Sequence, residues 1–411
     1  MPQSRKINFQ KLRTGTHETF RSLEIRNFRL FFIGQLISQT GNWLTLIAQA
    51  LLVLHLTNNN GVAVGVLTGC QFFPLLFLGA WTGVVADRSD KRKLLMIVQS
   101  CAMGQSFILA ILGFSNNPPL FAFYAVALLG GVATAFDNPT RRSFIVEMIP
   151  DTHVQNAVSL NSALMTGSRI FGPAIAGLLI TTVGYGWCFT VDGLSYVAVI
   201  YGLSRMRIAD LYPSVRATRS KGQVREGLKY VFAIPEIRTS LVMLAIVGTF
   251  AFNFDVVIPL LVKKTFSGSD GAFTLLYAVV SFGSLGGALM TARRTTNSVR
   301  QISRSALIFG ISLLAIAAAP SFLLSFPGAI LLGFASISFM TSIFVIVQLN
   351  ASSEMRGRVL AIQALVFLGA TPIGGPIVGA LCQIFGARTG FIVGALSCFA
   401  AAAYGHRNQL K

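Results

Sequence analysis

The chain has 411 residues, of which 53% are hydrophobic and only 11% are charged. Soluble domains carry roughly 25% charged residues, and a soluble protein of this size cannot bury so much apolar surface. The composition therefore excludes an ordinary soluble globular fold and indicates a membrane protein.

Long uncharged stretches show where the chain crosses the membrane. No Asp, Glu, Lys or Arg occurs between Arg29 and Asp87, and similar stretches cover residues 94–136 and 305–353. A membrane-spanning helix needs about 20 apolar residues, so each stretch accommodates two spans and a turn. We predict an all-α membrane protein with twelve spans. Their expected ranges are 28–56, 62–86, 94–114, 120–136, 158–183, 184–203, 239–262, 271–292, 302–320, 323–350, 359–384 and 387–405.

The basic residues are distributed unequally between the two sides of the predicted bundle. Of the 33 Lys and Arg residues, Lys263, Lys264 and Arg388 fall in loops that follow an odd-numbered span, and Arg169 falls inside a span. All others lie near the chain ends or in loops that follow an even-numbered span, and Lys and Arg accumulate on the cytoplasmic side. Both termini are therefore predicted to be cytoplasmic. The net charge of +19 is a topology signal and does not indicate nucleic-acid binding.

Five segments follow from this topology. We expect a cytoplasmic N-terminal segment (1–27), a six-helix bundle (28–203), a basic cytoplasmic linker (204–238), a second six-helix bundle (239–405) and a cytoplasmic tail (406–411). The linker is interpreted as a solvated tether, with a short amphipathic helix over residues 224–234 on the membrane surface as the alternative. Residues 1–26 contain no apolar stretch, so no cleavable signal peptide is expected.

Metal binding and disulfide bonds are not indicated by the cysteines. All five lie in apolar segments, and their spacing is not that of metal ligands. We predict that they are buried and reduced, and we expect no metal and no cofactor. The cysteines are Cys70, Cys101, Cys188, Cys382 and Cys398.

The two halves of the chain resemble each other. Glu24-Ile25-Arg26 before the first span recurs as Glu236-Ile237-Arg238 before the seventh. A Gly-x3-Gly pair in the second span recurs in the eighth, and a Gly-Pro pair in the fifth recurs in the eleventh, at a nearly constant offset. This order predicts a six-plus-six duplication, which is typical of secondary transporters with a substrate site between the halves.

A glycine-and-charge motif follows the second span, where the sequence reads Gly83-Val-Val-Ala-Asp87-Arg88-Ser-Asp90-Lys91-Arg92-Lys93. It resembles the loop 2–3 signature of the major facilitator superfamily, except that Asp90 replaces the usual second glycine. The resemblance implies a cytoplasmic gating motif of Gly83, Asp87, Arg88, Lys91, Arg92 and Asp137. Asp87 would accept hydrogen bonds at the start of the eleventh span, and one basic residue of the loop would pair with Asp137. Plain positive-inside anchoring is the alternative.

The fifth span carries a second motif, formed by Gly167, Gly172, Pro173 and Gly177. It resembles the antiporter signature of the same superfamily, with close helix packing as the alternative interpretation. Together with Asp137-Asn-Pro-Thr-Arg-Arg142 and Glu354-Met-Arg-Gly-Arg-Val359, it resembles the branch of the enterobactin exporter and the macrolide-efflux proteins.

Three ionisable residues fall well inside spans, namely Arg169, Asp192 and Asp255. Such residues are costly in a bilayer, so each is a candidate for proton coupling. In the superfamily fold the seventh span lines the cavity, and this resemblance favours Asp255, with Asn253 nearby, over Asp192. Asp192 is interpreted as a structural partner, and for Arg169 a structural pair and a ligand role stay open.

A polar stripe follows one face of the first span at helical spacing, with Trp43 beside it. Lipid does not tolerate such a stripe, so it must face the bundle interior. We predict that Gln35, Gln39, Asn42 and Trp43 line a substrate cavity together with Asn253, with interhelical hydrogen bonding as the alternative. The rest of the cavity is expected to be apolar and rich in Phe. The full stripe is Gln35, Ser38, Gln39, Asn42, Thr45 and Gln49.

These features together predict a proton-coupled exporter in the inner membrane of a bacterium. The expected substrate is a small amphipathic or aromatic molecule, drug-like or siderophore-like, and the expected unit is a monomer in the lipid bilayer. An importer or uniporter of a nutrient or metabolite is the alternative within transporters. A membrane-embedded lipid-modifying enzyme is disfavoured, because the spans contain no acid cluster and no nucleophile with a base.

Overall fold

The computed structural model describes residues 20–212, 223–292, 298–352 and 355–409. Within these residues, twelve segments are long and apolar enough to cross a membrane, which confirms the twelve-span all-α fold. The first bundle contains α2 (Arg26–Leu56), α3 (Gly61–Arg88), α4 (Lys91–Phe114), α5 (Leu120–Glu147), α6 (Val154–Thr182) and α7 (Tyr185–Ser204). The second contains α9 (Pro235–Phe250), α10 (Phe254–Leu260), α11 (Asp270–Ala292), α12 (Val299–Ala318), α13 (Phe326–Asn350), α14 (Arg356–Phe385) and α15 (Arg388–Gln409).

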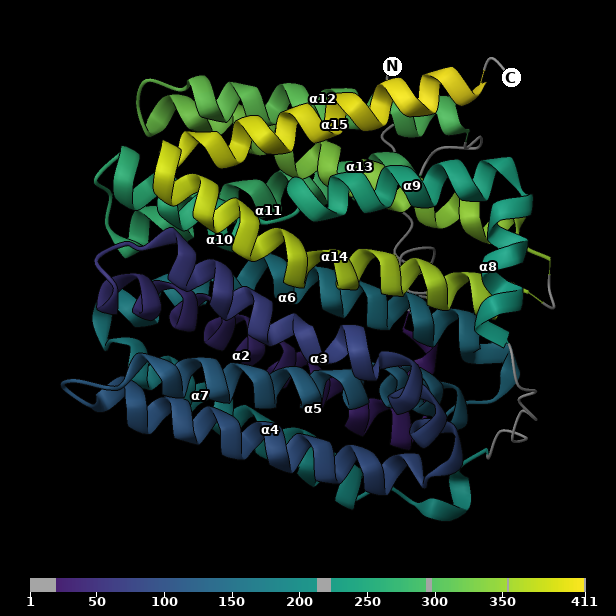
Figure 1. Cartoon of the computed structure of the whole chain (residues 1–411). Helices are drawn as coiled ribbons and strands as arrows, with labels where there is room; N and C mark the ends of the chain where they lie inside the picture. The colour runs from purple at the N-terminus through teal and green to yellow at the C-terminus, as the bar shows by residue number, and fades with distance from the viewer. Residues whose placement is uncertain (1–19, 213–222, 293–297, 353–354, 410–411) are drawn as a thin grey trace, which may run out of the picture.

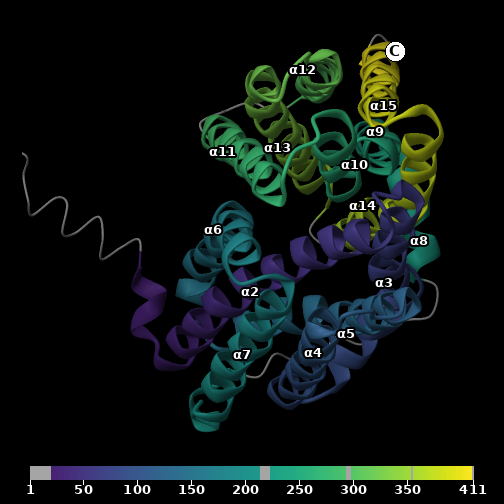
Figure 2. The same cartoon turned by 90° about the vertical axis from the view of Figure 1, so that its left-hand side faces the viewer.

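The two bundles, called here the N bundle and the C bundle, lie side by side (Figure 1). We call the end of the molecule that holds α8, the start of α2 and the end of α15 the linker end, and the opposite end the distal end. Figure 2 looks onto the distal end and shows that the bundles meet where α3 lies against α14 and α6 lies against α11.

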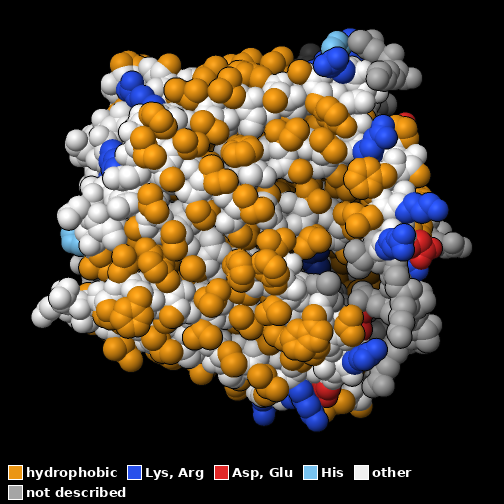
Figure 3. Space-filling model, in the orientation of Figure 1, with side chains coloured by type: hydrophobic (Ala, Val, Ile, Leu, Met, Phe, Trp, Pro, Cys, Tyr) orange, Lys and Arg blue, Asp and Glu red, His pale blue; other side chains and the backbone are white. Residues whose placement is uncertain are grey.

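On the face shown in Figure 3, apolar side chains dominate the surface between the two ends. Lys and Arg gather toward the ends of the helices, mostly at the linker end, as the unequal distribution of charge in the sequence requires. A belt of apolar side chains with charges at its edges is the surface that a lipid bilayer covers.

The linker between the bundles contains a short helix, α8 (Gln223–Ala233). Its Glu226 forms an ion pair with Arg358 of α14 at 2.7 Å, and the Tyr230 hydroxyl accepts a hydrogen bond from the Ser352 backbone at 2.9 Å. The helix considered as the alternative to a tether is therefore present, and it packs against the start of α14. Residues 213–222 of the expected tether lie outside the described residues.

Helix α5 continues well beyond the apolar stretch that was expected to end at residue 136. Asp137 and Arg141 form an ion pair one helical turn apart, with 2.5 Å between Oδ2 and Nη2. The Thr140 hydroxyl also donates to the Phe136 carbonyl at 2.6 Å. These local bonds keep the segment after the apolar stretch helical, although it contains Pro139.

The seventh span is interrupted at residues 251–253, between α9 and α10. The prediction of one continuous helix over 239–262 is therefore wrong at this point. At the break the Asn253 amide donates to the Thr249 carbonyl at 2.7 Å, and the backbone of Asn253 accepts from the first turn of α10. In transporters, broken helices occur where the backbone lines a binding or ion site, and here the break directly precedes Asp255.

The bundles are in close contact at the distal end and separate toward the linker end. A Cβ atom added to Gly65 of α3 would lie 2.6 Å from the Gly375 carbonyl oxygen of α14, so the backbones touch there. Nearer the linker end, Gly79 and Gly83 of α3 and Gly357 of α14 have no such neighbour within 4 Å. In this state Gly83 of the gating motif therefore has open space beside it rather than the start of α14.

Polar contacts between the bundles reinforce the closed distal end. The Gly61 amide of α3 donates to the Gln383 side chain of α14 at 3.0 Å. The Tyr185 hydroxyl of α7 donates to Asp270 of α11, which also pairs with Lys263 at 2.5 Å. Opening of this end requires that these bonds break.

We predict that a larger side chain opens the distal end when it is added at Gly65 of α3 but has no effect there when it is added at Gly83. Gly65→Leu places a side chain where α14 allows no space, so it should open the distal end. Gly83→Leu meets no neighbour and should leave the distal end closed. Spin labels at Asn116 and Ser321, in a background without the native cysteines, would measure the separation. An unchanged distance in Gly65→Leu would contradict the packing described here.

Candidate functional site

A cavity with two adjoining chambers lies in and beside the N bundle. The interface chamber, about 340 Å³, lies between the bundles, and the N-bundle chamber, about 290 Å³, lies among α2 to α5. They share Gln39, Asn42, Leu46 and Met165. The interface chamber adds Trp43, Arg169, Ser281, Ser284 and Ile337.

The polar stripe of the first span reaches this cavity. Gln39 and Asn42 line both chambers and Trp43 lines the interface chamber. Gln35 lies behind the wall, fully buried, where it accepts hydrogen bonds from Gln39 at 3.3 Å and from Arg141 at 3.2 Å. Asn253 is buried at the break of the seventh span and is not among the lining residues of these chambers.

The phenylalanines are placed differently from the expectation. Among the lining residues of the two chambers, Phe72 is the one phenylalanine. Many of the others pack against one another in the C bundle, where Phe252 lies 5.2 Å from Phe309 and 5.4 Å from Phe367 between ring centroids. The phenylalanines thus pack mainly in the C bundle, and the N-bundle chamber has a mixed wall that includes several side-chain amides.

The glycines of the fifth span bring helices together around the interface chamber. A Cβ atom on Gly172 would lie 2.3 Å from Cβ of Trp43, and one on Gly177 would lie 2.1 Å from the Thr274 hydroxyl of the C bundle. Gly167 faces open space. The missing side chain of Gly172 therefore leaves the space that Trp43 occupies. The centroid of the Trp43 ring lies 6.2 Å from that of Tyr277.

Pro173 adds a hydrogen bond between the bundles. Proline has no backbone N–H, so the carbonyl four residues earlier, that of Arg169, loses its helical donor. The Ser281 hydroxyl of α11 donates to this carbonyl at 3.2 Å. The Gly-Pro pair of the fifth span thus exposes a backbone acceptor to the other bundle.

Arg169, Tyr277 and Asp255 form a charged cluster across the bundle interface. The Tyr277 hydroxyl donates to Asp255 Oδ1 at 3.0 Å. Arg169, from the N bundle, interacts electrostatically with both C-bundle residues. Asp255 lies in the first turn of α10, directly after the helix break, where the positive end of the helix dipole stabilises a carboxylate. Two of the three predicted candidates for proton coupling are therefore brought together.

Asp192, the third candidate, lies apart from this cluster inside the N bundle. Its Oδ2 accepts hydrogen bonds from Thr45 of α2 and Ser106 of α4, both at 2.7 Å. Gly41 leaves the space for it, since a Cβ there would lie 2.7 Å from Asp192 Oδ1. Asp192 therefore ties α7 to α2 and α4.

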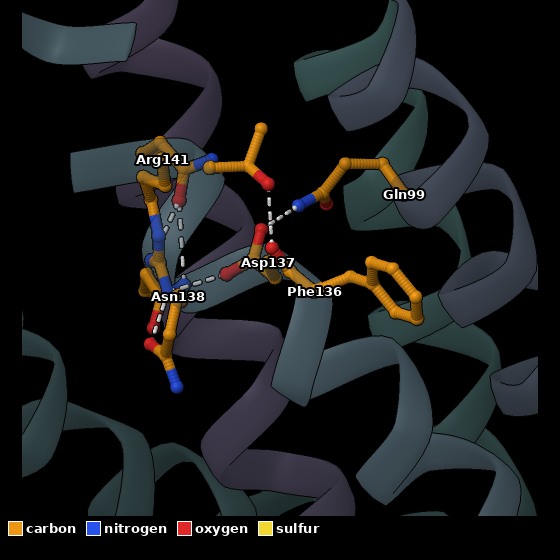
Figure 4. A network of polar contacts seen from close by, with 8 residues as sticks. Gln99, Phe136, Asp137, Asn138 and Arg141 are labelled. Carbon is orange, nitrogen blue, oxygen red and sulfur yellow. Dashed lines mark hydrogen bonds and ion pairs between the residues drawn. The ribbon is translucent and has the colours of Figure 1, made fainter. Parts of the chain in front are cut away.

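Asp137 and Arg141 form a further charged pair at the N-bundle chamber (Figure 4). Asp137 accepts from the Gln99 amide at 2.7 Å, and Arg141 donates to Asn138 at 3.3 Å. Figure 4 shows Gln99 and Arg141 approaching Asp137 from opposite sides. The sequence analysis missed Arg141, although its spacing of four from Asp137 is a signal for an ion pair on a helix.

The basic residues of the gating motif have other partners. Lys91 pairs with Glu147 at 2.5 Å, and Arg92 donates to the carbonyls of Leu203 at 2.6 Å and Ser204 at 3.1 Å. In this structure Lys91 and Arg92 therefore do not pair with Asp137, because Arg141 is one helical turn away from it. Asp90, at the position of the missing glycine, caps α4 by accepting from the Lys93 amide at 3.0 Å.

The surroundings of the five cysteines differ from one to the next. In the part of the chain that is described, no group of three or more His, Cys, Asp and Glu residues could hold a metal ion. Cys188, Cys382 and Cys398 are buried, but Cys70 is half-buried and Cys101 is exposed on α4. The prediction that all five are buried was wrong for these two, because an apolar helix in a membrane also has a face toward lipid.

Two six-helix bundles around a cavity, with a broken helix beside it, define a multi-pass membrane transporter. A family profile described as transmembrane secretion effector matches residues 17–411, and the chain belongs to this family of the major facilitator superfamily. Its substrate is therefore a small molecule, and a membrane-embedded enzyme is excluded.

Relatives of known name agree with this family. The Staphyloferrin A transporter of Staphylococcus aureus is 26% identical over 371 residues, which cover 89% of this chain and 92% of the relative. The multidrug efflux pump Tap of Mycobacterium tuberculosis is 24% identical over 386 residues, which cover 89% of this chain and 90% of the pump. A solved bacterial homologue of the human lysosomal transporter Spinster shares the fold with a TM-score of 0.76, at 14% identity, over 93% of this chain and 97% of that chain.

We predict that Asp192 contributes to stability through its two hydroxyl donors. Asp192→Ala leaves both hydroxyls buried without an acceptor, which should lower the free energy of unfolding by about 2 kcal/mol or more. Asp192→Asn keeps an acceptor oxygen and should cost less. Equilibrium unfolding in mixed micelles would measure both values. Equal costs for the two variants would show that the hydroxyl bonds are unimportant.

Proposed function

We propose that this transporter is a proton-coupled exporter in the inner membrane of a bacterium, with both termini in the cytoplasm. Its substrate would be an amphipathic, drug-like or siderophore-like molecule, and the proton gradient would supply the energy without a cofactor. The names of its relatives, a staphyloferrin A transporter and a multidrug efflux pump, support transport of such molecules. We expect it to act as a monomer.

The arrangement of the bundles supports binding of the substrate from the cytoplasmic side. The positive-inside rule assigns the linker end to the cytoplasmic side. The bundles are closed at the distal end and separate toward the linker end. The observed state would therefore receive a substrate from the cytoplasm.

The interface chamber supports an amphipathic substrate. Its wall combines the apolar side chains of Leu46, Met165 and Ile337 with the indole of Trp43. Gln39, Asn42 and Arg169 add hydrogen-bond donors and one positive charge. Such a wall can hold a molecule with an apolar body and a polar group.

The charged cluster across the interface carries the proposal of proton coupling. An ionised Asp255 attracts Arg169 of the other bundle, and protonation removes this attraction. A proton on Asp255 would thus weaken one of the contacts between the bundles. This links the binding of a proton to the equilibrium between the two states of the transporter.

The experiment is proton movement in proteoliposomes with an imposed pH gradient, during addition of macrolides, dyes and catecholate siderophores. We expect compound-dependent proton release that is lost in Asp255→Asn. Asp90→Asn is the matched control, because Asp90 is exposed and Asn also caps helices. Without compound-dependent proton movement by folded protein, proton antiport is refuted. Protons that move in the same direction as the compound would instead indicate an importer.

A further inference from the structure

The N-bundle chamber has an unusual wall for a cavity in a membrane protein. Buried polar groups in a span are costly unless they are satisfied or used. The N-bundle chamber nevertheless contains many side-chain amides and only a few large apolar side chains. The amides that line it are Gln39, Asn42, Gln49, Gln71, Gln99, Gln105 and Asn138.

Hydrogen bonds hold several of these amides in fixed directions. The Gln71 amide donates to Gln49 Oε1 at 3.0 Å, and the Gln49 amide donates to the Phe123 carbonyl at 3.2 Å. Gln105 lies over Gly130, where an added Cβ would be 2.2 Å from its Nε2. The wall is therefore preorganised, which reduces the entropy lost when a ligand binds.

One buried acceptor at this wall has no partner. Gln99 is 4% exposed, and its Nε2 donates to Asp137. Its Oε1 is buried without a hydrogen-bond partner among the described residues. A buried unpaired carbonyl oxygen costs about 1–3 kcal/mol, so this side of the wall is incompletely satisfied in the observed state.

Arg141 supplies the positive charge of the chamber. It is 6% exposed and donates to Asp137, Gln35 and Asn138. Among these partners Asp137 is the one carboxylate, held at 2.5 Å. A guanidinium binds any carboxylate in the same geometry, so a ligand carboxylate can share or replace Asp137 on Arg141.

We propose that the N-bundle chamber binds a group that carries one carboxylate and several hydroxyls. The carboxylate would lie on Arg141, and the hydroxyls would bond to the side-chain amides. This inference rests on the proposed function, since that group would be the polar end of the transported molecule. The apolar end would occupy the interface chamber, which shares Gln39 and Asn42 with the N-bundle chamber.

The test is calorimetric titration of the full chain in lipid nanodiscs with two probes. Quinate is a ring with a carboxylate and several hydroxyls, and cyclohexanecarboxylate is the same ring without hydroxyls. We expect quinate to bind at least about tenfold more tightly, because unused side-chain amides are costly. Equal binding of the two probes, or no binding of quinate, would overturn the proposal.

Two charge variants should act in opposite directions. Arg141→Gln should weaken quinate binding by roughly tenfold or more, because a charge-assisted bond is lost. Asp137→Asn removes the competing carboxylate from Arg141 and should tighten binding. If both variants weaken binding by the same factor, the pair is structural and the assignment of the carboxylate to Arg141 is wrong.

Two neutral variants keep the test valid if the charge variants do not fold. Gln105→Met preserves side-chain length and should weaken quinate binding while leaving cyclohexanecarboxylate unaffected. Gln155→Met is the matched control on the exposed start of α6. An unchanged affinity for quinate in Gln105→Met would contradict a role of the amides.

A failure of the proposed binding in the N-bundle chamber can be distinguished from a failure of the proposed proton-coupled export. Asp255 lies outside the N-bundle chamber, so Asp255→Asn should keep the roughly tenfold preference for quinate over cyclohexanecarboxylate even where proton movement is lost. Quinate binding without any proton coupling would retain the chamber and refute the antiporter. Proton-coupled transport without quinate binding would retain the antiporter and refute the proposed role of the N-bundle chamber.

Discussion

The satisfaction of buried polar groups inside the membrane is the constraint on which the N bundle depends. Lipid offers no hydrogen bonds, so each polar side chain of α2 must find its partner in another helix or in a cavity. Thr45 bonds to Asp192, Gln49 bonds to a carbonyl of α5, and Gln35 accepts from Arg141. The polar stripe of α2 thus fixes the positions of its neighbours and also forms the wall of the cavity.

The C bundle satisfies its buried polar groups differently. Its interior is packed by phenylalanine rings around Phe252 and Phe309, and hydroxyl groups there bond mainly to the backbone of their own helix. Thr291 follows the Gly283-x3-Gly287 pair of α11 at the same spacing as Asp87 follows Gly79-x3-Gly83 in α3. Its hydroxyl donates to the Gly287 carbonyl at 2.8 Å. The two bundles therefore differ. The N bundle supplies most of the side chains that line the cavity, and the C bundle supplies Ser281, Ser284 and Ile337 there. The C bundle also supplies the Asp255 and Tyr277 side chains of the charged cluster.

The sequence predicted the number of spans and the polar face of α2, because both depend on local composition and helical period. It did not predict the break before Asp255, since residues 251–253 contain neither Pro nor Gly. The position of the phenylalanines could not be predicted either. An apolar residue in a span can face lipid, core or cavity, and its type alone does not distinguish these surroundings.

The fifth span shows how a sequence motif becomes a contact between the bundles. Proline removes one backbone donor, and the carbonyl of Arg169 is left without its helical partner. Ser281 of the other bundle provides the missing donor at 3.2 Å. The side chain of the same Arg169 faces Tyr277 and Asp255, so its backbone and its charge both bind the C bundle. A change in the charge of Asp255 therefore acts at a point where α6 is already held by the opposite bundle, and local electrostatics can alter the fit of whole helices.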